Sequence, residues 1–123
     1  MPICFIFQVS LSELDLSGNR ILTLPPSSFP ASVPLTRLNL RANRIVSLEK
    51  GSLDTLVSLK ELVLTKNRLS SFPKGIFKKM ASLEVLEVNR NKLVEVAGLS
   101  FDGLKSLRTL KMKRNRVRKK AMN

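Results

Sequence analysis

One apolar pattern recurs along this chain at an interval of 24 residues. Its clearest copy runs from Leu83 to Leu93 and has the form L-x-x-L-x-V-x-x-N-x-L. The asparagines of the pattern keep the same interval throughout: Asn19, Asn43, Asn67, Asn91 and Asn115. Such a period predicts repeats that stack on one another as the turns of a solenoid, because each repeat can bury its apolar face only against its neighbours.

Within each repeat, apolar residues alternate over L-x-x-L-x-L as they do in a short strand with one buried face. Stacking then predicts one parallel sheet, with its leucines inward and the intervening side chains on a concave face. The segments beyond the asparagines predict loops and short helical or 3-10 turns on the convex face. The expected fold class is an α/β solenoid, a short curved arc whose five strands span roughly 20 Å at the usual strand spacing.

The repeated asparagine falls where the chain turns out of each strand. An amide side chain carries both hydrogen-bond donors and an acceptor. It can therefore pair backbone groups of its own turn and of the adjacent turn, which would otherwise be buried without a partner. We expect the five asparagines to form a structural ladder.

The pattern is the signature of the leucine-rich repeat, and the chain from Leu11 to Val117 resembles that family. The phenylalanines at 29, 77 and 101 match the 24-residue type that is typical of extracellular members. The repeats are expected at 11–34, 35–58, 59–82, 83–106 and, truncated, 107–117. Residues 1–10 form an N-terminal remnant without a convincing signal peptide, and 118–123 form a basic tail.

Three segments carry a closer resemblance: LEVNRNK at 86–92, GLSF at 98–101 and LKMKRN at 110–115. They are similar to the family of leucine-rich repeats and immunoglobulin-like domains proteins. Members are single-pass membrane proteins whose repeat ectodomain modulates growth-factor receptor signalling. The resemblance implies that this chain is an internal part of such an ectodomain, at the extracellular face of the plasma membrane. The chain itself has no apolar run long enough to span a membrane.

The charge balance is strongly basic, with 22 lysines and arginines against nine acidic residues. A basic residue follows every ladder asparagine, and these residues predict a stripe along the stacked turns: Arg20, Arg44, Arg68, Lys92 and Arg116. Such a stripe favours sulfated glycan or an anionic surface, while a charged edge that only keeps the chain soluble is the alternative. Nucleic acid is disfavoured as a partner, because every phenylalanine falls at a core position and none is left to stack on bases.

The strands and the residues just after them define a candidate concave binding face: Arg37, Asn39, Arg41, Glu61, Val63, Thr65, Glu87, Asn89, Arg90, Lys111 and Lys113. Solenoids bind proteins on such extended surfaces. The leading expectation is therefore a protein-interaction module for a protein ligand or a receptor ectodomain. Two alternatives stay open: an electrostatic binder of sulfated glycan or anionic surfaces, and a truncated fragment without function.

Nothing in the sequence predicts an enzyme. The chain has no histidine and one cysteine, and its nine carboxylates are scattered. It also lacks a glycine-rich phosphate loop and a nucleophile elbow. We expect no catalytic residue, no metal site and no cofactor.

Overall fold

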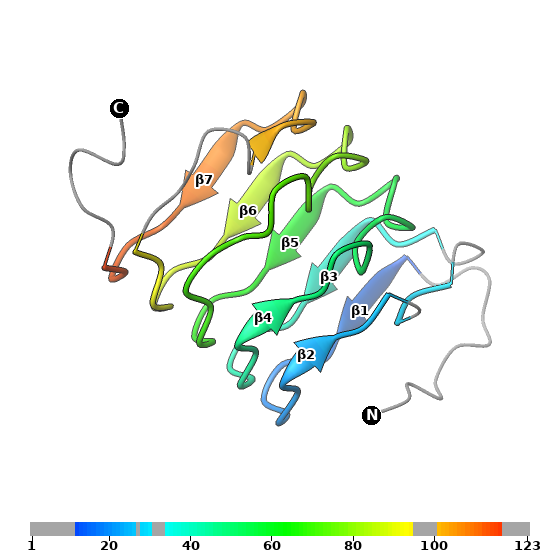
Figure 1. The fold of residues 1–123 in the computed structure, drawn as a ribbon. Helices are drawn as coiled ribbons and strands as arrows, with labels where there is room; N and C mark the ends of the chain where they lie inside the picture. The colour runs from blue at the N-terminus through cyan, green and yellow to red at the C-terminus, as the bar shows by residue number, and fades with distance from the viewer. Residues whose placement is uncertain (1–11, 27, 31–33, 95–100, 117–123) are drawn as a thin grey trace.

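The computed structural model describes residues 12–26, 28–30, 34–94 and 101–116. Five three-residue strands form one parallel sheet, in chain order: β1 (Glu13–Asp15), β3 (Arg37–Asn39), β5 (Glu61–Val63), β6 (Val85–Glu87) and β7 (Thr109–Lys111). Figure 1 shows the five arrows side by side, with the turns that follow them stacked beside the arrowheads. The predicted solenoid with a parallel sheet is confirmed.

The register of the sheet repeats the sequence interval, since each strand pairs with the equivalent residues 24 positions later. Leu38 lies opposite Leu14 and Leu62, and Leu86 lies opposite Leu62. This register places equivalent positions of the repeats in straight columns across the strands. The interior columns of leucine are the result, because only a 24-residue step keeps all of them on one face.

The core consists of these inward columns and of apolar residues from the outer segments. The central leucines Leu38, Leu62 and Leu86 are fully buried. Phe77 is also fully buried, and its ring stacks on that of Phe101 with 6.0 Å between the centroids. Burial falls at the two outer strands, where Leu14 is half-buried and Leu110 is 40% exposed. These strands each have a described neighbour on one side only.

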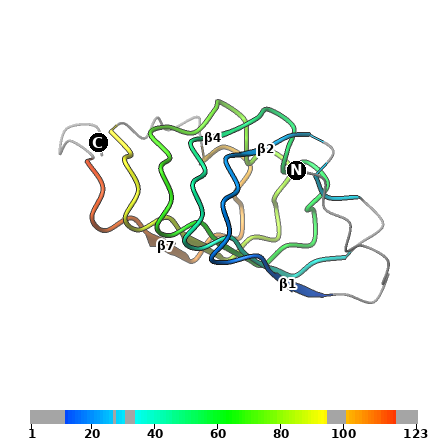
Figure 2. The same cartoon turned by 90° about the horizontal axis from the view of Figure 1, so that it is seen from below.

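A second, two-stranded sheet was not predicted. It pairs β2 (Thr23–Leu24) with β4 (Ser47–Leu48) in parallel. Figure 2 shows these strands in the layer opposite the main sheet. Each strand has only two residues, with one inward leucine (Leu24 and Leu48, both buried). An alternation of apolar and polar residues needs a longer stretch before it is recognisable.

The outer segments are turns closed by backbone hydrogen bonds between residues three positions apart. The N–H of Leu56 donates to the carbonyl of Leu53 at 3.1 Å, and that of Met80 donates to Phe77 at 3.0 Å. Short helical or 3-10 turns were predicted here. In the described parts of the chain, one residue (Phe101) has 3-10 geometry and no α-helix forms. The outer segments hold too few residues between their buried apolar side chains to offset the free-energy cost of nucleating a helix.

The ladder asparagines bond to two turns each, and Asn67 shows the pattern. Its Nδ2 donates to the carbonyl of Leu64 in its own turn and to that of Leu40 in the preceding turn, both at 3.0 Å. Its Oδ1 accepts the N–H of Ile45, also in the preceding turn, at 3.0 Å. Asn43, Asn91 and Asn115 repeat this arrangement.

The first ladder residue, Asn19, is exposed, and its only bonds within the described residues go to carbonyls of its own turn, those of Leu16 and Ser17. By contrast, Asn43, Asn67 and Asn91 are each 7% exposed. The three central asparagines thus join neighbouring turns from inside the fold, where water cannot replace them.

Replacing Asn67 with alanine should lower the free energy of unfolding by about 1–3 kcal/mol, because buried backbone groups of Ile45, Leu40 and Leu64 lose their partner. Urea denaturation followed by circular dichroism measures this loss. Asn19→Ala is the matched control and should cost less, since water can take over its bonds. Equal losses in the two variants would contradict a buried ladder.

Glycine is required at position 103 for a steric reason. Gly103 has a φ of +100°, and a Cβ there would lie 2.6 Å from the backbone carbonyl oxygen of Lys78 in the preceding repeat. Gly75 also has a positive φ, +77°, but a Cβ there would meet nothing within 4 Å. Among the described glycines, Gly103 alone therefore combines a left-handed backbone with a close approach between turns.

Gly103→Ala should accordingly lower the melting temperature more than Gly75→Ala does. Both variants strain a left-handed residue by about 1 kcal/mol. Gly103→Ala must in addition push two turns apart, which adds about 1–3 kcal/mol. Thermal melts of the two variants provide the comparison, and equal shifts would show that the contact with Lys78 does not constrain the packing.

Candidate interaction surface

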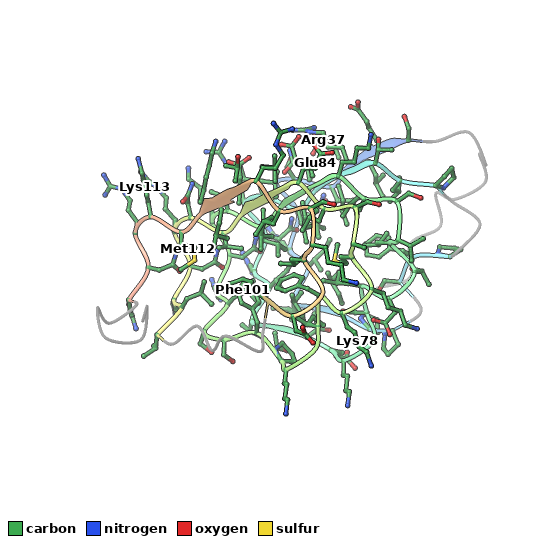
Figure 3. The ribbon with its side chains drawn as sticks, turned by 90° about the horizontal axis from the view of Figure 1, so that it is seen from above. Arg37, Lys78, Glu84, Phe101, Met112 and Lys113 are labelled. Atoms are coloured by element: carbon green, nitrogen blue, oxygen red, sulfur yellow. The ribbon has the colours of Figure 1, made fainter. Side chains whose placement is uncertain are left out.

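Side chains that alternate with the buried leucines form the open face of the main sheet. Figure 3 shows Arg37 and Glu84 on this face, Phe101 between the two layers, and Lys78 on the opposite side of the molecule. The strand register sorts the face into two columns. One contains Glu13, Arg37, Glu61, Val85 and Thr109, and the other contains Asp15, Asn39, Val63, Glu87 and Lys111.

Opposite charges meet across neighbouring strands on this open face. Arg37 Nε donates to Glu61 Oε1 at 3.3 Å, and Lys111 Nζ lies 3.8 Å from Glu87 Oε1. All four side chains are partly exposed, so each pair contributes at most about 1 kcal/mol to stability. Their effect is to hold charged groups in a defined position on the face.

The sheet face changes sign along the solenoid. Its first strand carries Glu13 and Asp15, whereas the last strand carries Lys111 and is flanked by Arg108 and Lys113. The strands between them carry both signs. The two ends of the open face therefore differ in sign, with mixed charges between them, so the face is not the uniformly basic surface that the net charge of the chain would suggest.

The predicted binding-face residues divide into two groups. Six lie on strands: Arg37, Asn39, Glu61, Val63, Glu87 and Lys111. The other five lie on the turns just beyond the strand ends: Arg41, Thr65, Asn89, Arg90 and Lys113. The structure thus brings the first group together on the sheet and the second group along one edge of it.

Two of the predicted binding-face residues expose little surface to a partner. Val63 is 5% exposed and Thr65 is 8% exposed. Both belong to the central repeat, where short side chains are flanked on both sides by the neighbouring strands β3 and β6. They shape the floor of the face, and the longer charged side chains around them supply most of its accessible atoms.

Two asparagines of the predicted binding face, one on a strand and one on a turn, are already bonded to the backbone. Asn39 Oδ1 accepts the N–H of Arg41 at 3.0 Å, and Asn89 Oδ1 accepts the N–H of Lys113 at 2.7 Å. The second bond crosses from one repeat to the next. These two asparagines therefore act partly as turn supports, which leaves fewer of their hydrogen-bonding groups for a partner.

The predicted basic stripe lies on the stacked turns, and all five of its residues are exposed: Arg20, Arg44, Arg68, Lys92 and Arg116. The last four donate their backbone N–H to a carbonyl of the preceding turn, at 2.8–3.0 Å. Within the described part of the chain, none of the five forms an ion pair. The backbone of the stripe thus repeats from turn to turn, and no described carboxylate forms an ion pair with its charges.

A second cationic column was missed in the sequence. Lys66, Arg90 and Arg114 precede ladder asparagines and have left-handed φ values of 61°, 55° and 58°. Of these, only Arg90 was a predicted site residue. Gly18 holds the same position in the first repeat, with a φ of 72°. That glycine was the available signal for a left-handed position, because glycine adopts such a backbone without strain.

Metal and membrane sites were searched within the same described ranges. No three histidine, cysteine, aspartate or glutamate side chains there come together as a set of metal ligands. No helix among those residues has the length and apolar character to cross a bilayer. The remnant at 1–10 and the basic tail at 118–123 lie outside the described residues.

The carboxylate of Asp15 has a pKa below its ordinary value of 3.8, because the hydroxyl and the backbone N–H of Ser17 both donate to it. A lowered pKa means that the ionised carboxylate supports the fold above the ordinary value. That support disappears as the pH falls through the lowered pKa. The contribution of Asp15 to the first turn is therefore lost on acidification.

Ser17→Ala removes one of the two donors and should raise the pKa of Asp15 toward its ordinary value, without reaching it. A carbon-detected NMR titration of the Asp15 carboxyl group measures the change. Ser12→Ala is the control, since no hydrogen bond joins the Ser12 hydroxyl to Asp15. An unchanged pKa in Ser17→Ala would show that the hydroxyl does not hold the carboxylate.

Comparisons with known proteins give a family and a related fold. The family model for the leucine rich repeat matches residues 9–69 and 57–117. The crystal structure of the leucine-rich repeat domain of APL1B superposes with a TM-score of 0.78 at 27% sequence identity, covering 86% of this chain. The chain spans 31% of that solved domain. A search of curated proteins found no match. Because the family model matches nearly the whole chain, the protein belongs to the leucine-rich repeat family.

Proposed function

We propose that this chain is a non-enzymatic protein-interaction module that binds a protein partner on the open face of its sheet. The observation that supports this function best is the row of partly exposed charged side chains on five parallel strands, with Arg37, Glu61, Glu87 and Lys111 held in cross-strand pairs. Membership of the leucine-rich repeat family fits such a module.

The scaffold favours binding because it is rigid where the partner would dock. Buried leucines fix one side of each strand, and Asn43, Asn67 and Asn91 tie each turn to the preceding one. Side chains on a fixed backbone lose less conformational entropy when a partner arrives. Affinity then depends on complementarity rather than on reordering of the chain.

The opposite charges at the two ends of the open face define the kind of partner that fits. A complementary protein surface is basic where it faces Glu13 and Asp15 and acidic where it faces Lys111 and Lys113. Such a partner docks in one direction along the solenoid, across the strands, since the reversed orientation places like charges together at both ends. The charge difference between the ends thus supplies orientation as well as attraction.

A finer form of this proposal rests on the resemblance of residues 86–92 and 110–115 to the leucine-rich repeats and immunoglobulin-like domains family. On that basis the chain is part of the ectodomain of a cell-surface protein. Its partner is then the ectodomain of a growth-factor receptor, and its role is to modulate receptor signalling.

The test is binding of the purified chain to a panel of growth-factor receptor ectodomains by surface plasmon resonance. The double variant Arg37→Ala with Lys111→Ala should weaken binding to the recognised ectodomain at least tenfold, about 1.4 kcal/mol. Lys74→Ala with Lys78→Ala removes the same charge from the outer turns and should have no effect. Equal losses in both variants would point to non-specific attraction by net charge.

A second outcome separates the proposal of a growth-factor receptor as the partner from the broader proposal of protein binding on the sheet face. If none of the growth-factor receptor ectodomains binds but another cell-surface protein does, and the same face variant weakens it, the sheet face remains the binding site. The link to growth-factor signalling then fails on its own. Binding that ignores the Arg37 and Lys111 variant altogether would overturn the sheet face as the site.

A further inference from the structure

The edge of the sheet carries a dense cationic ladder that is separate from the open face. It consists of the two cations that flank the ladder asparagine in each of the last three turns: Lys66, Arg68, Arg90, Lys92, Arg114 and Arg116. All six are exposed, and none forms an ion pair with a described carboxylate. The stacked turns carry no acidic residue at 65–70, 89–94 or 113–116.

We propose that this cationic ladder is a binding site for a linear sulfated glycan, laid along the stacked turns and across the strand direction. This function goes beyond the proposed binding of a protein on the sheet face. Successive turns are spaced as the strands are, about 4.8 Å apart. The ladder therefore presents a pair of cations at each step to a chain that carries sulfates along its length.

Backbone hydrogen bonds hold the ladder in place from both sides. The N–H groups of Lys66 and Arg90 donate to carbonyls of the following turn, those of Asn89 and Lys113, at 2.9 and 2.8 Å. The N–H groups of Arg68 and Lys92 donate in the other direction, to the preceding turn, at 2.8 Å each. The backbone positions that carry the charges are thus set by hydrogen bonds between turns.

The left-handed positions are occupied at a cost. Lys66, Arg90 and Arg114 have positive φ values, where a residue with a Cβ is strained relative to glycine. Gly18 at the equivalent place in the first turn shows that the fold accepts glycine there. The same left-handed backbone recurs at Ala42, so the fold sets it in every turn, and in the last three turns the residue at this position carries a positive charge.

The chemistry of the neighbouring residues favours a glycan over other polyanions. Nucleic acid binding relies on aromatic side chains that stack on bases, and the described phenylalanines Phe29, Phe72, Phe77 and Phe101 belong to the core cluster or pack against it. Membrane binding relies on an apolar strip beside the cations. In the cation-rich turns, the exposed position that could extend such a strip holds Ser70 in one turn and Val94 in the next. These two residues do not form a continuous apolar strip.

The test uses heparin as the probe and a variant that should not harm the fold. Lys66→Gly, Arg90→Gly and Arg114→Gly together remove three charges and relieve three strained positions, so the melting temperature should stay level or rise. Heparin affinity, measured by isothermal titration calorimetry, should fall at least tenfold. The slope of log affinity against log salt should flatten by about 2, because three ionic contacts are lost.

The matched control removes three exposed lysines from the outer turns: Lys74→Gln, Lys78→Gln and Lys105→Gln. Its heparin affinity should stay within a factor of about two of the unaltered chain, since these cations lie off the ladder. Equal losses in the two triple variants would overturn the proposal in favour of diffuse attraction by net charge. The Arg37 and Lys111 variant should retain heparin binding, which distinguishes this site from the sheet face.

Three further probes identify the ligand class. Desulfated heparin should bind at least tenfold more weakly than heparin, because the ladder pairs with sulfates. Single-stranded DNA and phosphatidylserine vesicles should bind more weakly than heparin at the same salt concentration. Tighter binding of either would overturn the assignment to a glycan, as would desulfated heparin binding as well as heparin.

Discussion

Hydrogen bonding between an asparagine side chain and the backbone of two adjacent turns is the interaction on which this fold depends. Each strand is only three residues long, so the sheet ladder alone offers few bonds per turn. The amides of Asn43, Asn67 and Asn91 pair buried carbonyl and N–H groups that no strand reaches. Without them the leucine columns would pack against turns with unpaired polar groups, which is costly in a dry interior.

The same interaction explains why the surface is built in columns. Because the ladder and the sheet both repeat at 24 residues, every exposed position lies next to its equivalents in the neighbouring turns. A substitution in one repeat therefore alters one step of a column. In this way the sheet face carries an acidic residue at Glu13 and a basic residue at Lys111, and the turn edge carries a run of cations, over one repeating core.

The two surfaces differ in the kind of recognition they support. On the sheet face, Glu61 and Glu87 each pair with one cation on a neighbouring strand, so a partner must match both signs. On the turn edge, Arg68, Lys92 and their neighbours have no described acidic partner, so their charges act together. A rigid row of one sign attracts flexible polyanions, whereas a mixed face selects a shaped protein surface.

The sequence alone determined the solenoid, its sheet and its core, because a fixed 24-residue period leaves only one way to bury five sets of leucines. The role of the asparagines also followed from their chemistry. Tertiary structure decided the features that depend on neighbouring turns: the burial of Val63 and Thr65, the small β2–β4 sheet and the ion pairs. It also revealed the left-handed backbone at Lys66, Arg90 and Arg114, since a backbone angle is set by hydrogen bonds between turns and not by the type of side chain.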